Sequence, residues 1–239
     1  MIKEKYDNPL EAIESVQKYI EKQGSMAGQW LLEAGCGSLS RIKLPDAIQL
    51  AGIDISQKQL DRNDSLSEKI CGDLQTYPLT PDKYALAICW DVLEHLPQPK
   101  NAVQNLVKSL QPGGLLILAL PNVRSLKGLV TRYSPYGFHV WYYRAILGIK
   151  DAGSNETAPF KTFLNEDIEP ASMMAMIEEM GCNIEKLIYR DAMVYRLKMS
   201  HRALWHIYNV TAQLLKLLTM GRYGGSSNSD YIVIARKNA

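Results

Sequence analysis

The fold class of this chain is decided by residues 30–38, which read WLLEAGCGS. An apolar run leads through Glu33 into a Gly-x-Gly turn, a pattern typical of a buried strand that ends beside a ligand. Gly35 and Gly37 allow the backbone to approach a bound molecule, because a side chain there would occupy the ligand's space. By itself such a turn does not specify the ligand, so the neighbouring stretches must do so.

Four more apolar runs follow and have the character of buried strands. They cover residues 51–55, 70–73, 84–90 and 115–120. Helical patterns separate them, one after Ser56 and one over 97–110, and a Pro-Gly-Gly turn closes the second. Five strands that alternate with helices predict an α/β fold with a mostly parallel sheet and helices on both faces, as in Rossmann-like proteins.

The rest of the chain adds five predicted elements. They are a helix after Asn8-Pro9, a Met-rich helix over 171–180, a strand over 184–190, a helix over about 203–220 and a last strand over 231–235. Residues 122–165 are irregular and rich in aromatic side chains. We therefore expect one domain over 1–239, with an acceptor or lid insertion at about 122–165 and a helical insertion at about 199–222.

Acidic residues stand at the ends of four successive strands. They are Glu33, Asp54, Asp73 and Asp91. Ligands of open parallel sheets bind outside the carboxyl ends of the strands. Asp54 lies 19 residues after Gly35, where its carboxylate can accept hydrogen bonds from two ribose hydroxyls, and Asp73 can accept one from an exocyclic amino group. The first three strand ends therefore predict a nucleoside site.

These motifs also resemble those of a known family. In order along the chain they are LLEAGCGS, AGIDIS, CGDLQTYPL, YALAICWDVLEHLPQP and LVKSLQPGGLLILALPN. With this order and spacing the chain resembles the class I S-adenosylmethionine-dependent methyltransferases. The resemblance covers roughly residues 29–122, together with 160–187 and 229–237. It implies a seven-stranded sheet with an antiparallel last strand, and S-adenosyl-L-methionine as cofactor with S-adenosyl-L-homocysteine as product.

The same resemblance implies roles for individual residues. Glu33, Gly35 and Gly37 would line the methionine and ribose, Asp54 would bind the ribose, and Asp73 and Leu74 would flank the adenine. Trp90, Asp91 and His95 would lie where the fourth strand opens over the cofactor. The residues expected to complete this cofactor set are Cys36, Ile55 and Tyr6.

Two features depart from the family pattern. The family usually has a third glycine near Leu39, where this chain reads Ser38-Leu39-Ser40, and Pro45 interrupts a short segment that is normally a longer helix. A dinucleotide site is the rival interpretation, but it requires glycine or alanine where Ser40 stands. Glu33 before the glycines and the second acid at Asp73 favour the methyl donor.

Metal binding is not expected. Some relatives hold a divalent cation with an acid-x-x-Glu-His run, and this chain has Asp91, Glu94 and His95 in that arrangement. Two acids and one histidine are few ligands for a hard cation, so a capping or supporting role is favoured. The four cysteines show no Cys-x-x-Cys spacing and are expected to be reduced.

The segment after the fifth strand is the expected acceptor region. It carries aromatic residues around His139, the candidate catalytic base, and basic residues that include Arg124, Lys127, Arg132 and Arg144. Aromatic rings can wall off water and stack on an apolar or sugar-like acceptor, and the basic groups can pair with a phosphate or carboxylate. The alternative is an aromatic lid that only excludes water. We therefore expect a partly apolar small-molecule acceptor that carries or adjoins negative charge.

The helix over 203–220 combines a polar stripe with a broad apolar surface. Its polar residues repeat at spacings of four and three: Arg202, His206, Asn209, Gln213 and Lys216. Core or homodimer packing is one interpretation of the apolar surface, and docking on a membrane surface is the other.

Composition limits the remaining classes. Apolar residues make up 46% and charged residues 22%, and the formal net charge is +2, which gives no sign of a nucleic-acid partner. Residues 1–94 are net acidic, whereas 95–150 and 192–229 contain no acid. No apolar run is long enough for a membrane span and no secretory signal is visible, so we expect a cytoplasmic protein, with the inner face of a membrane as the alternative location.

The sequence thus predicts an enzyme that transfers a methyl group from S-adenosylmethionine to a small molecule, at an oxygen of a sugar, lipid-linked or natural-product intermediate. A catalytically silent cofactor-binding scaffold is one alternative. A membrane-surface methyltransferase of lipids or quinone precursors is another. A nucleic-acid methyltransferase is disfavoured, because the Pro-Pro-Tyr type run that serves base amines is replaced by Trp90-Asp91-Val92-Leu93.

Overall fold

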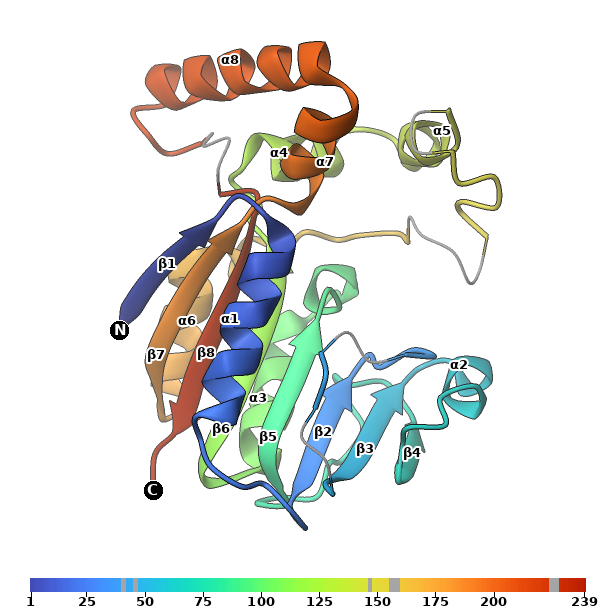
Figure 1. Cartoon of the computed structure of the whole chain (residues 1–239), viewed down its shortest axis with the longest axis vertical. Coiled ribbons are helices and arrows are strands. Elements are labelled where there is room, and N and C mark those ends of the chain that lie inside the picture. Colours follow the sequence, from blue (N-terminus) through green and yellow to red (C-terminus); the bar gives the residue numbers. More distant parts are fainter. Residues whose placement is uncertain (40–41, 45–46, 146–147, 155–159, 224–227) are drawn as a thin grey trace.

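A computed structural model describes residues 1–39, 42–44, 47–145, 148–154, 160–223 and 228–239, without the side chains of 192–194 and 196. Over these residues, eight strands form one sheet in the order β1-β7-β8-β6-β5-β2-β3-β4 (Figure 1). The strands are β1 (Ile2–Tyr6), β2 (Trp30–Ala34), β3 (Gln49–Asp54), β4 (Glu68–Cys71), β5 (Tyr84–Trp90), β6 (Leu110–Pro121), β7 (Cys182–Arg190) and β8 (Asp230–Lys237). Ser40 and Pro45, which marked the departures from the family pattern, lie outside the described residues.

The predicted α/β architecture is confirmed. Strand β8 runs antiparallel to both of its neighbours, β6 and β7, and the other paired strands are parallel. The sheet, however, has eight strands and not the seven that the resemblance implies. The additional strand β1 pairs with β7 at the sheet edge, from Ile2 opposite Lys186 to Tyr6 opposite Arg190. Its charged sequence, IKEKY, hides it because an edge strand need not be apolar.

Helices cover both faces of the sheet. Helix α1 (Pro9–Glu21) begins at Asn8, whose side chain accepts a hydrogen bond from the Leu10 N–H, and packs Ala12, Val16 and Ile20 on one face. The opposite face is covered by α3 (Pro99–Ser109) and by α6 (Pro170–Glu179) (Figure 1). Met173, Met176 and Ile177 of α6 are buried there, so the Met-rich helix packs in the core.

Four further helices form a layer beyond the carboxyl ends of the parallel strands, which we call the cap (Figure 1). They are α4 (Leu126–Tyr133), α5 (Tyr136–Ala145), α7 (Ala192–Ser200) and α8 (Arg202–Leu218). The cap therefore combines two insertions that are far apart in the sequence, and the second begins directly after β7. The remaining elements are α2 (Gln57–Asp61), η1 (Leu93–His95) and η2 (Glu166–Ile168). None of the described helices has the length and hydropathy that crossing a bilayer requires.

Candidate functional site

The turn after β2 is a tight backbone cradle. Gly35 and Gly37 have φ angles of 66° and 52°, in the left-handed region that glycine tolerates best. The Gly35 N–H donates to the Ile53 carbonyl oxygen at 2.7 Å and so ties the turn to β3. A Cβ atom on Gly35 would lie 2.2 Å from Cγ2 of Val92. Glycine is therefore required at this position by contact with the segment after β5.

Asp54 lies at the end of β3 and is held by two backbone groups. Its Oδ2 accepts from the Gly37 N–H at 2.9 Å, and its Oδ1 accepts from the Ser56 N–H at 2.9 Å. The carboxylate is therefore oriented by the glycine turn on one side and by the start of α2 on the other. Each oxygen retains capacity for another donor, as a ribose hydroxyl would be.

The neighbouring strand end is suited to an adenine ring. Asp73 accepts a hydrogen bond from the Gln75 N–H at 2.9 Å, and Leu74 packs in the core. Ile55 is 78% exposed although it follows directly on a buried strand. An exposed isoleucine between Asp54 and Asp73 offers an apolar surface that a base can cover. The residues present therefore fit the nucleoside part of S-adenosylmethionine.

Two more residues of the predicted cofactor set, Glu33 and Cys36, are buried at this turn. Glu33 is almost fully buried in β2. Burial, together with the Asp54 and Glu33 carboxylates, raises the pKa of the Cys36 thiol to about 12. Cys36 is therefore a neutral thiol at physiological pH and packs in the turn without the reactivity of a thiolate.

The end of β5 is tied to the end of β7. Asp91 has a φ angle of 54°, which is rare for a residue other than glycine. An ion pair of 3.2 Å joins its Oδ1 to the buried Arg190, whose guanidinium carbon lies 4.7 Å from the centroid of the Trp90 ring. Arg190 thus fixes both Trp90 and Asp91, which the family resemblance would place over the cofactor. Arg190 itself was missed, since nothing in the sequence links it to Asp91.

Glu94 and His95 form the next turn, η1. Burial and the Asp91 carboxylate raise the pKa of Glu94 to about 8, so this carboxyl group is mostly protonated at pH 7. Burial lowers the pKa of His95, and its Nδ1 lies 2.8 Å from the Lys161 carbonyl oxygen. Among the described residues, no three His, Cys, Asp or Glu side chains are grouped as metal ligands.

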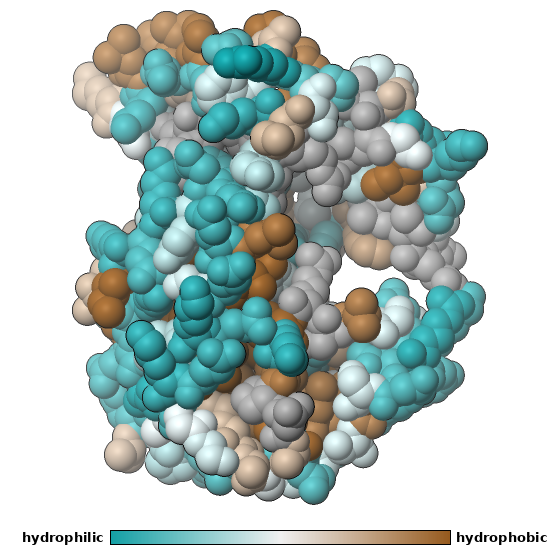
Figure 2. Space-filling view, in the orientation of Figure 1, coloured by the Kyte–Doolittle hydropathy of each residue, from teal (hydrophilic) through white to brown (hydrophobic). Residues whose placement is uncertain are grey.

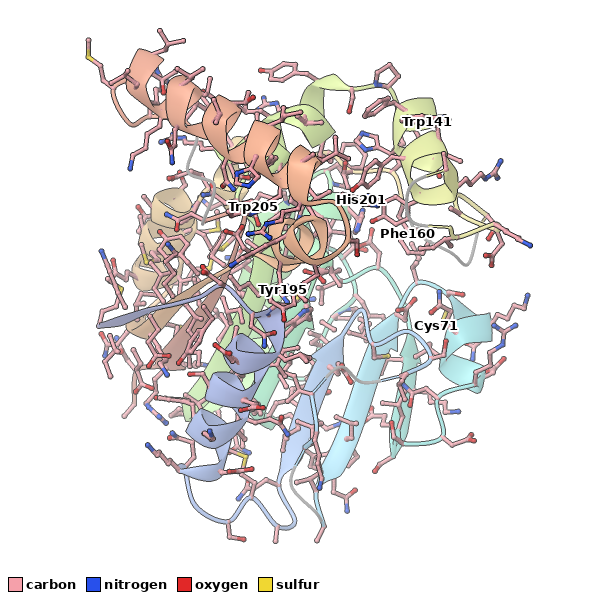
Figure 3. All side chains as sticks on the ribbon, turned by 45° about the horizontal axis from the view of Figure 1, so that its top comes forward. Cys71, Trp141, Phe160, Tyr195, His201 and Trp205 are labelled. Carbon is pink, nitrogen blue, oxygen red and sulfur yellow. The ribbon has the colours of Figure 1, made fainter. Side chains whose placement is uncertain are left out.

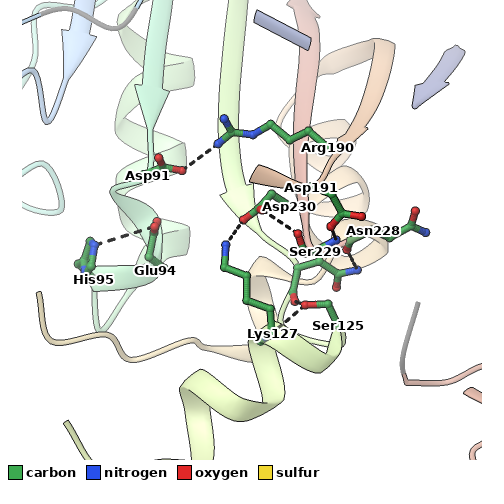
Figure 4. A network of polar contacts seen from close by, with 12 residues as sticks. Asp91, Glu94, His95, Ser125, Lys127, Arg190, Asp191, Asn228, Ser229 and Asp230 are labelled. Atoms are coloured by element: carbon green, nitrogen blue, oxygen red, sulfur yellow. Dashed lines mark hydrogen bonds and ion pairs between the residues drawn. The ribbon is translucent and has the colours of Figure 1, made fainter. Parts of the chain in front are cut away.

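A larger polar network continues from this turn under the cap (Figure 4). Lys127 of α4 pairs with the buried Asp230, which also accepts a hydrogen bond from the Ser229 hydroxyl at 2.9 Å. Asp191 accepts from the Ser229 N–H at 3.0 Å, and burial raises its pKa to about 7. The network joins residues from four separate segments of the chain. Clues in the sequence were few, although Asp191 and Asp230 each flank an apolar strand.

Helices α4 and α5 of the predicted acceptor segment lie in the cap, and four of the segment's basic groups have partners within the protein. Arg124 pairs with Glu169, Lys127 with Asp230, Arg132 with Glu166, and Arg144 donates to the Ala152 carbonyl oxygen. His139 lies on α5, where its Nε2 is 3.0 Å from the Ser134 hydroxyl. Its role as a base stays a prediction.

Tyr6 lies apart from the other predicted cofactor residues. It ends the edge strand β1, which three strands separate from β5, and its hydroxyl donates to Glu4 at 2.9 Å. Tyr6 is opposite Arg190 in the sheet register. It is thus nearer to the Arg190–Asp91 pair than to the glycine turn, and its contact with the cofactor stays a prediction.

Comparison with known proteins agrees with this geometry. Residues 32–118, which contain the glycine turn, both acidic strand ends and η1, match a family model described as a methyltransferase domain. The chain is 28% identical over 124 residues to the ubiquinone biosynthesis O-methyltransferase of Coxiella burnetii, covering 48% of this chain and 53% of that protein. These matches support a class I S-adenosylmethionine-dependent methyltransferase. The family, fold class and cofactor expected from the sequence are thereby confirmed.

Other curated relatives match a larger part of this chain. The chain is 26% identical over 181 residues to the ubiquinone biosynthesis O-methyltransferase of Nitrosospira multiformis, covering 71% of this chain and 69% of that protein. The alignment with the Coxiella protein, by contrast, spans only about half the length of that relative. The residues matched by the family model, 32–118, end before the first helix of the cap, α4.

Solved structures show the same fold at low identity. The cyclase SpnF has a TM-score of 0.55 and 16% identity, covering 94% of this chain and 81% of that chain. Magnesium protoporphyrin IX methyltransferase from Synechocystis, solved with S-adenosylmethionine, has a TM-score of 0.52 and 15% identity, covering 95% and 79%. These structures establish the architecture, whereas their reactions concern those proteins alone.

Proposed function

We propose that this protein transfers a methyl group from S-adenosylmethionine to a hydroxyl oxygen of a small, partly apolar acceptor bound under the cap. The observation that carries the proposal is the position of the Asp54 and Asp73 cradle, which opens at the same edge of the sheet as the polar network around Asp91. Oxygen is favoured as the methylated atom because the relatives from Coxiella burnetii and Nitrosospira multiformis are named O-methyltransferases.

The chain's own residues would bind and align the reactants. S-adenosylmethionine, when bound, supplies a methyl group activated by a positively charged sulfur. The glycine turn and Asp54 would hold the nucleoside, and Trp90, clamped by Arg190, would form a rigid wall at the end of β5. Fixed alignment of the acceptor oxygen is the main contribution that such a site makes to an in-line displacement.

The acceptor hydroxyl must also lose a proton, and two groups of this chain are candidates to take it. His139 is the candidate that the sequence suggests, because it is the histidine of the acceptor segment. Glu94 is the candidate that the structure adds, since it is a buried carboxyl group beside Asp91 whose pKa is raised to about 8, and it would act through its ionised fraction, which grows as the pH rises. A base whose pKa lies near the working pH serves proton transfer best.

Two finer features of the acceptor belong to the same proposal. Exposed aromatic side chains of the cap, such as Tyr136, Phe138 and Trp141, favour a sugar, lipid-linked or quinone-precursor acceptor with an apolar part. A negatively charged acceptor would have to compete with the internal partners of Arg124, Lys127, Arg132 and Arg144. A panel of charged and uncharged acceptors of matched size therefore tests the charge directly.

Calorimetry and a methylation screen test the function. We expect S-adenosylmethionine and S-adenosylhomocysteine to bind in the micromolar range, and NAD not to bind. Incubation with labelled S-adenosylmethionine and pools of hydroxylated aromatic, sugar and lipid-linked metabolites should then yield a labelled product by mass spectrometry. Binding of NAD without S-adenosylmethionine would disprove the cofactor assignment.

The main competitor is a catalytically silent protein that binds the cofactor as a scaffold. It is worth testing because the fold is shared with SpnF, which carries the name of a cyclase and not of a methyltransferase. Tight cofactor binding with no labelled product from any acceptor pool would favour this alternative over methyl transfer.

A further inference from the structure

Helix α8 has two apolar sides, and only one of them packs on the protein. The inner side consists of residues that are buried or half-buried: Trp205, Tyr208, Ala212 and Leu215. The outer side carries exposed apolar residues spaced three or four apart along the helix, with one further leucine directly after the last of them. This outer row consists of Leu204, Ile207, Val210, Leu214, Leu217 and Leu218.

The inner side packs α8 against the rest of the protein. Lys198 of α7 lies over the Trp205 ring, with 5.7 Å from Nζ to the centroid. Figure 3 shows Trp205 on the side of α8 that turns toward α7 and the sheet. The outer row is consequently directed away from the protein, and Leu218 at its end is 80% exposed. Figure 2 shows the apolar surface running along α8 at the top of the molecule.

Charge in the cap has a single sign. The two sequence segments that build it, 122–150 and 192–229, contain ten Lys or Arg and no Asp or Glu. Several of these cations are exposed on or next to α8: Lys198, Arg202, Lys216 and Arg222. Along α8, His206 and Gln213 lie between Arg202 and Lys216 on one polar stripe. One flank of the outer row is therefore polar and basic.

We propose that the outer row of α8 docks on an anionic lipid bilayer, with the helix lying in the plane of the headgroups. An apolar row flanked by cations is the pattern of interfacial helices, which bury the row below the headgroups and pair the cations with anionic lipids. A second copy of this chain fits less well. Its cap would bring the same cations and, from these two segments, no carboxylate to meet them.

Docking in this way would give the cap a defined orientation. The cap lies beyond the carboxyl ends of the parallel strands (Figure 1), so the edge of the sheet that holds Asp54 and Asp91 faces the same side of the molecule as the outer row. An acceptor anchored in the bilayer would then reach the site without leaving the lipid. This last step rests on the proposed methyl transfer, whereas docking itself does not.

Vesicle binding tests the proposal with a matched pair of variants. Leu214→Glu with Leu217→Glu removes two members of the outer row, and Ile2→Glu with Leu10→Glu removes two exposed apolar residues outside the cap. Both pairs change the net charge equally. We expect wild type to co-sediment with phosphatidylcholine vesicles that contain phosphatidylglycerol, and to lose affinity by about tenfold or more in the α8 pair alone.

A second measurement reports insertion directly. In a Cys71→Ser background, which removes the one cysteine that is exposed among the described residues, an environment-sensitive fluorophore is placed at Leu214→Cys or at Leu10→Cys. A blue shift on adding the anionic vesicles is expected at position 214 alone.

Three results would overturn docking. They are equal vesicle binding by the two pairs of variants, no shift at position 214, and a lipid-free dimer that only the α8 pair dissociates. Calorimetry of S-adenosylmethionine binding without lipid is run on each variant. Intact cofactor binding then separates a failure of docking from a failure of the proposed function.

Discussion

The cofactor half and the cap of this protein are held together in different ways. In the cofactor half, the functional side chains are oriented by backbone groups a few residues away, as Asp54 is by the Gly37 and Ser56 N–H groups. In the cap, position depends on ion pairs between segments far apart in sequence, such as Lys127 with Asp230. Local hydrogen bonds leave a recognisable sequence pattern, whereas long-range pairs do not, so motifs reveal the first half better than the second.

Gly35→Val should have the largest effect and would test the rigidity of the cofactor half. Its Cβ meets Val92 at 2.2 Å, so the turn and the segment after β5 must separate. We expect loss of measurable S-adenosylmethionine binding and a clear fall in thermal stability. The matched control is Gly28→Val, because Gly28 also has a positive φ but has nothing within 4 Å of the added Cβ. The control should cost only about 1–2 kcal/mol of folding free energy.

If the two glycine variants behave alike, backbone strain and not the contact with Val92 accounts for the loss. Combining Gly35→Ala with Val92→Ala sharpens the result, because removing the Val92 branches relieves the contact. Partial recovery of cofactor binding in this double variant, relative to Gly35→Ala alone, is expected by calorimetry.

Asp54→Ala comes next in magnitude. We expect S-adenosylmethionine affinity to fall by about 1.5–3 kcal/mol, the usual range for hydrogen bonds to a charged group. Asp61→Ala, at the end of α2, serves as control because it also removes one carboxylate, one that accepts from Gln57 on an exposed surface. Unchanged affinity in a folded Asp54→Ala protein would show that the ribose is bound elsewhere.

Glu94→Gln tests the network between the two regions through pH. The pKa of Glu94 is raised from 4.5 to about 8, so the folded protein keeps a proton that the unfolded chain releases. The resulting stabilisation is complete below about pH 4.5 and is lost as the pH rises through about 8. Each pH unit inside this window changes the unfolding free energy by on the order of 1 kcal/mol.

Glutamine stays neutral, so the variant should lose less stability than wild type as the pH rises through this window. Denaturant unfolding at several pH values measures the difference. Asp191, whose pKa is raised from 3.8 to about 7, adds a slope in the same direction between those pH values in both proteins. A steeper pH dependence in Glu94→Gln than in wild type would contradict the assignment of Glu94 as a protonated, buried carboxyl group.

His139→Ala examines the cap alone. Once an acceptor is known, the variant should lower kcat while leaving the KM for S-adenosylmethionine within about twofold, because a base or an acceptor-positioning group acts on the transition state and not on cofactor affinity. Steady-state kinetics of His139→Ala and Arg144→Ala, beside a Trp90→Ala variant, locate the acceptor. If only the Trp90 variant loses kcat/KM, the acceptor does not use this part of the cap.

Chelation should have the smallest effect of all. Asp91, Glu94 and His95 offer few ligands, and Asp91 is already paired with Arg190. Turnover in EDTA should therefore match turnover without it. Loss of activity that magnesium restores would instead show that the η1 turn binds a cation.

What the sequence determined by itself follows from local physics. The glycine turn, Asp54 after a buried strand and the alternation of strands with helices specified the α/β sheet and a nucleoside site, because each depends on neighbours within about one strand and turn. The family resemblance added the antiparallel last strand. Edge strand β1 escaped prediction, since its charged residues satisfy an edge position without an apolar pattern.

Tertiary structure alone decided the rest. Only the folded chain brings Arg190 onto Trp90 and Asp91, buries Glu94 so that its pKa rises, and uses the basic residues of the acceptor segment in internal pairs. It also shows which side of α8 is covered and which is exposed. The spacing of residues in the sequence does not reveal this, because α8 has apolar residues on most of its circumference. In each case the energy comes from contacts between residues distant in sequence, and periodicity carries no information about such contacts.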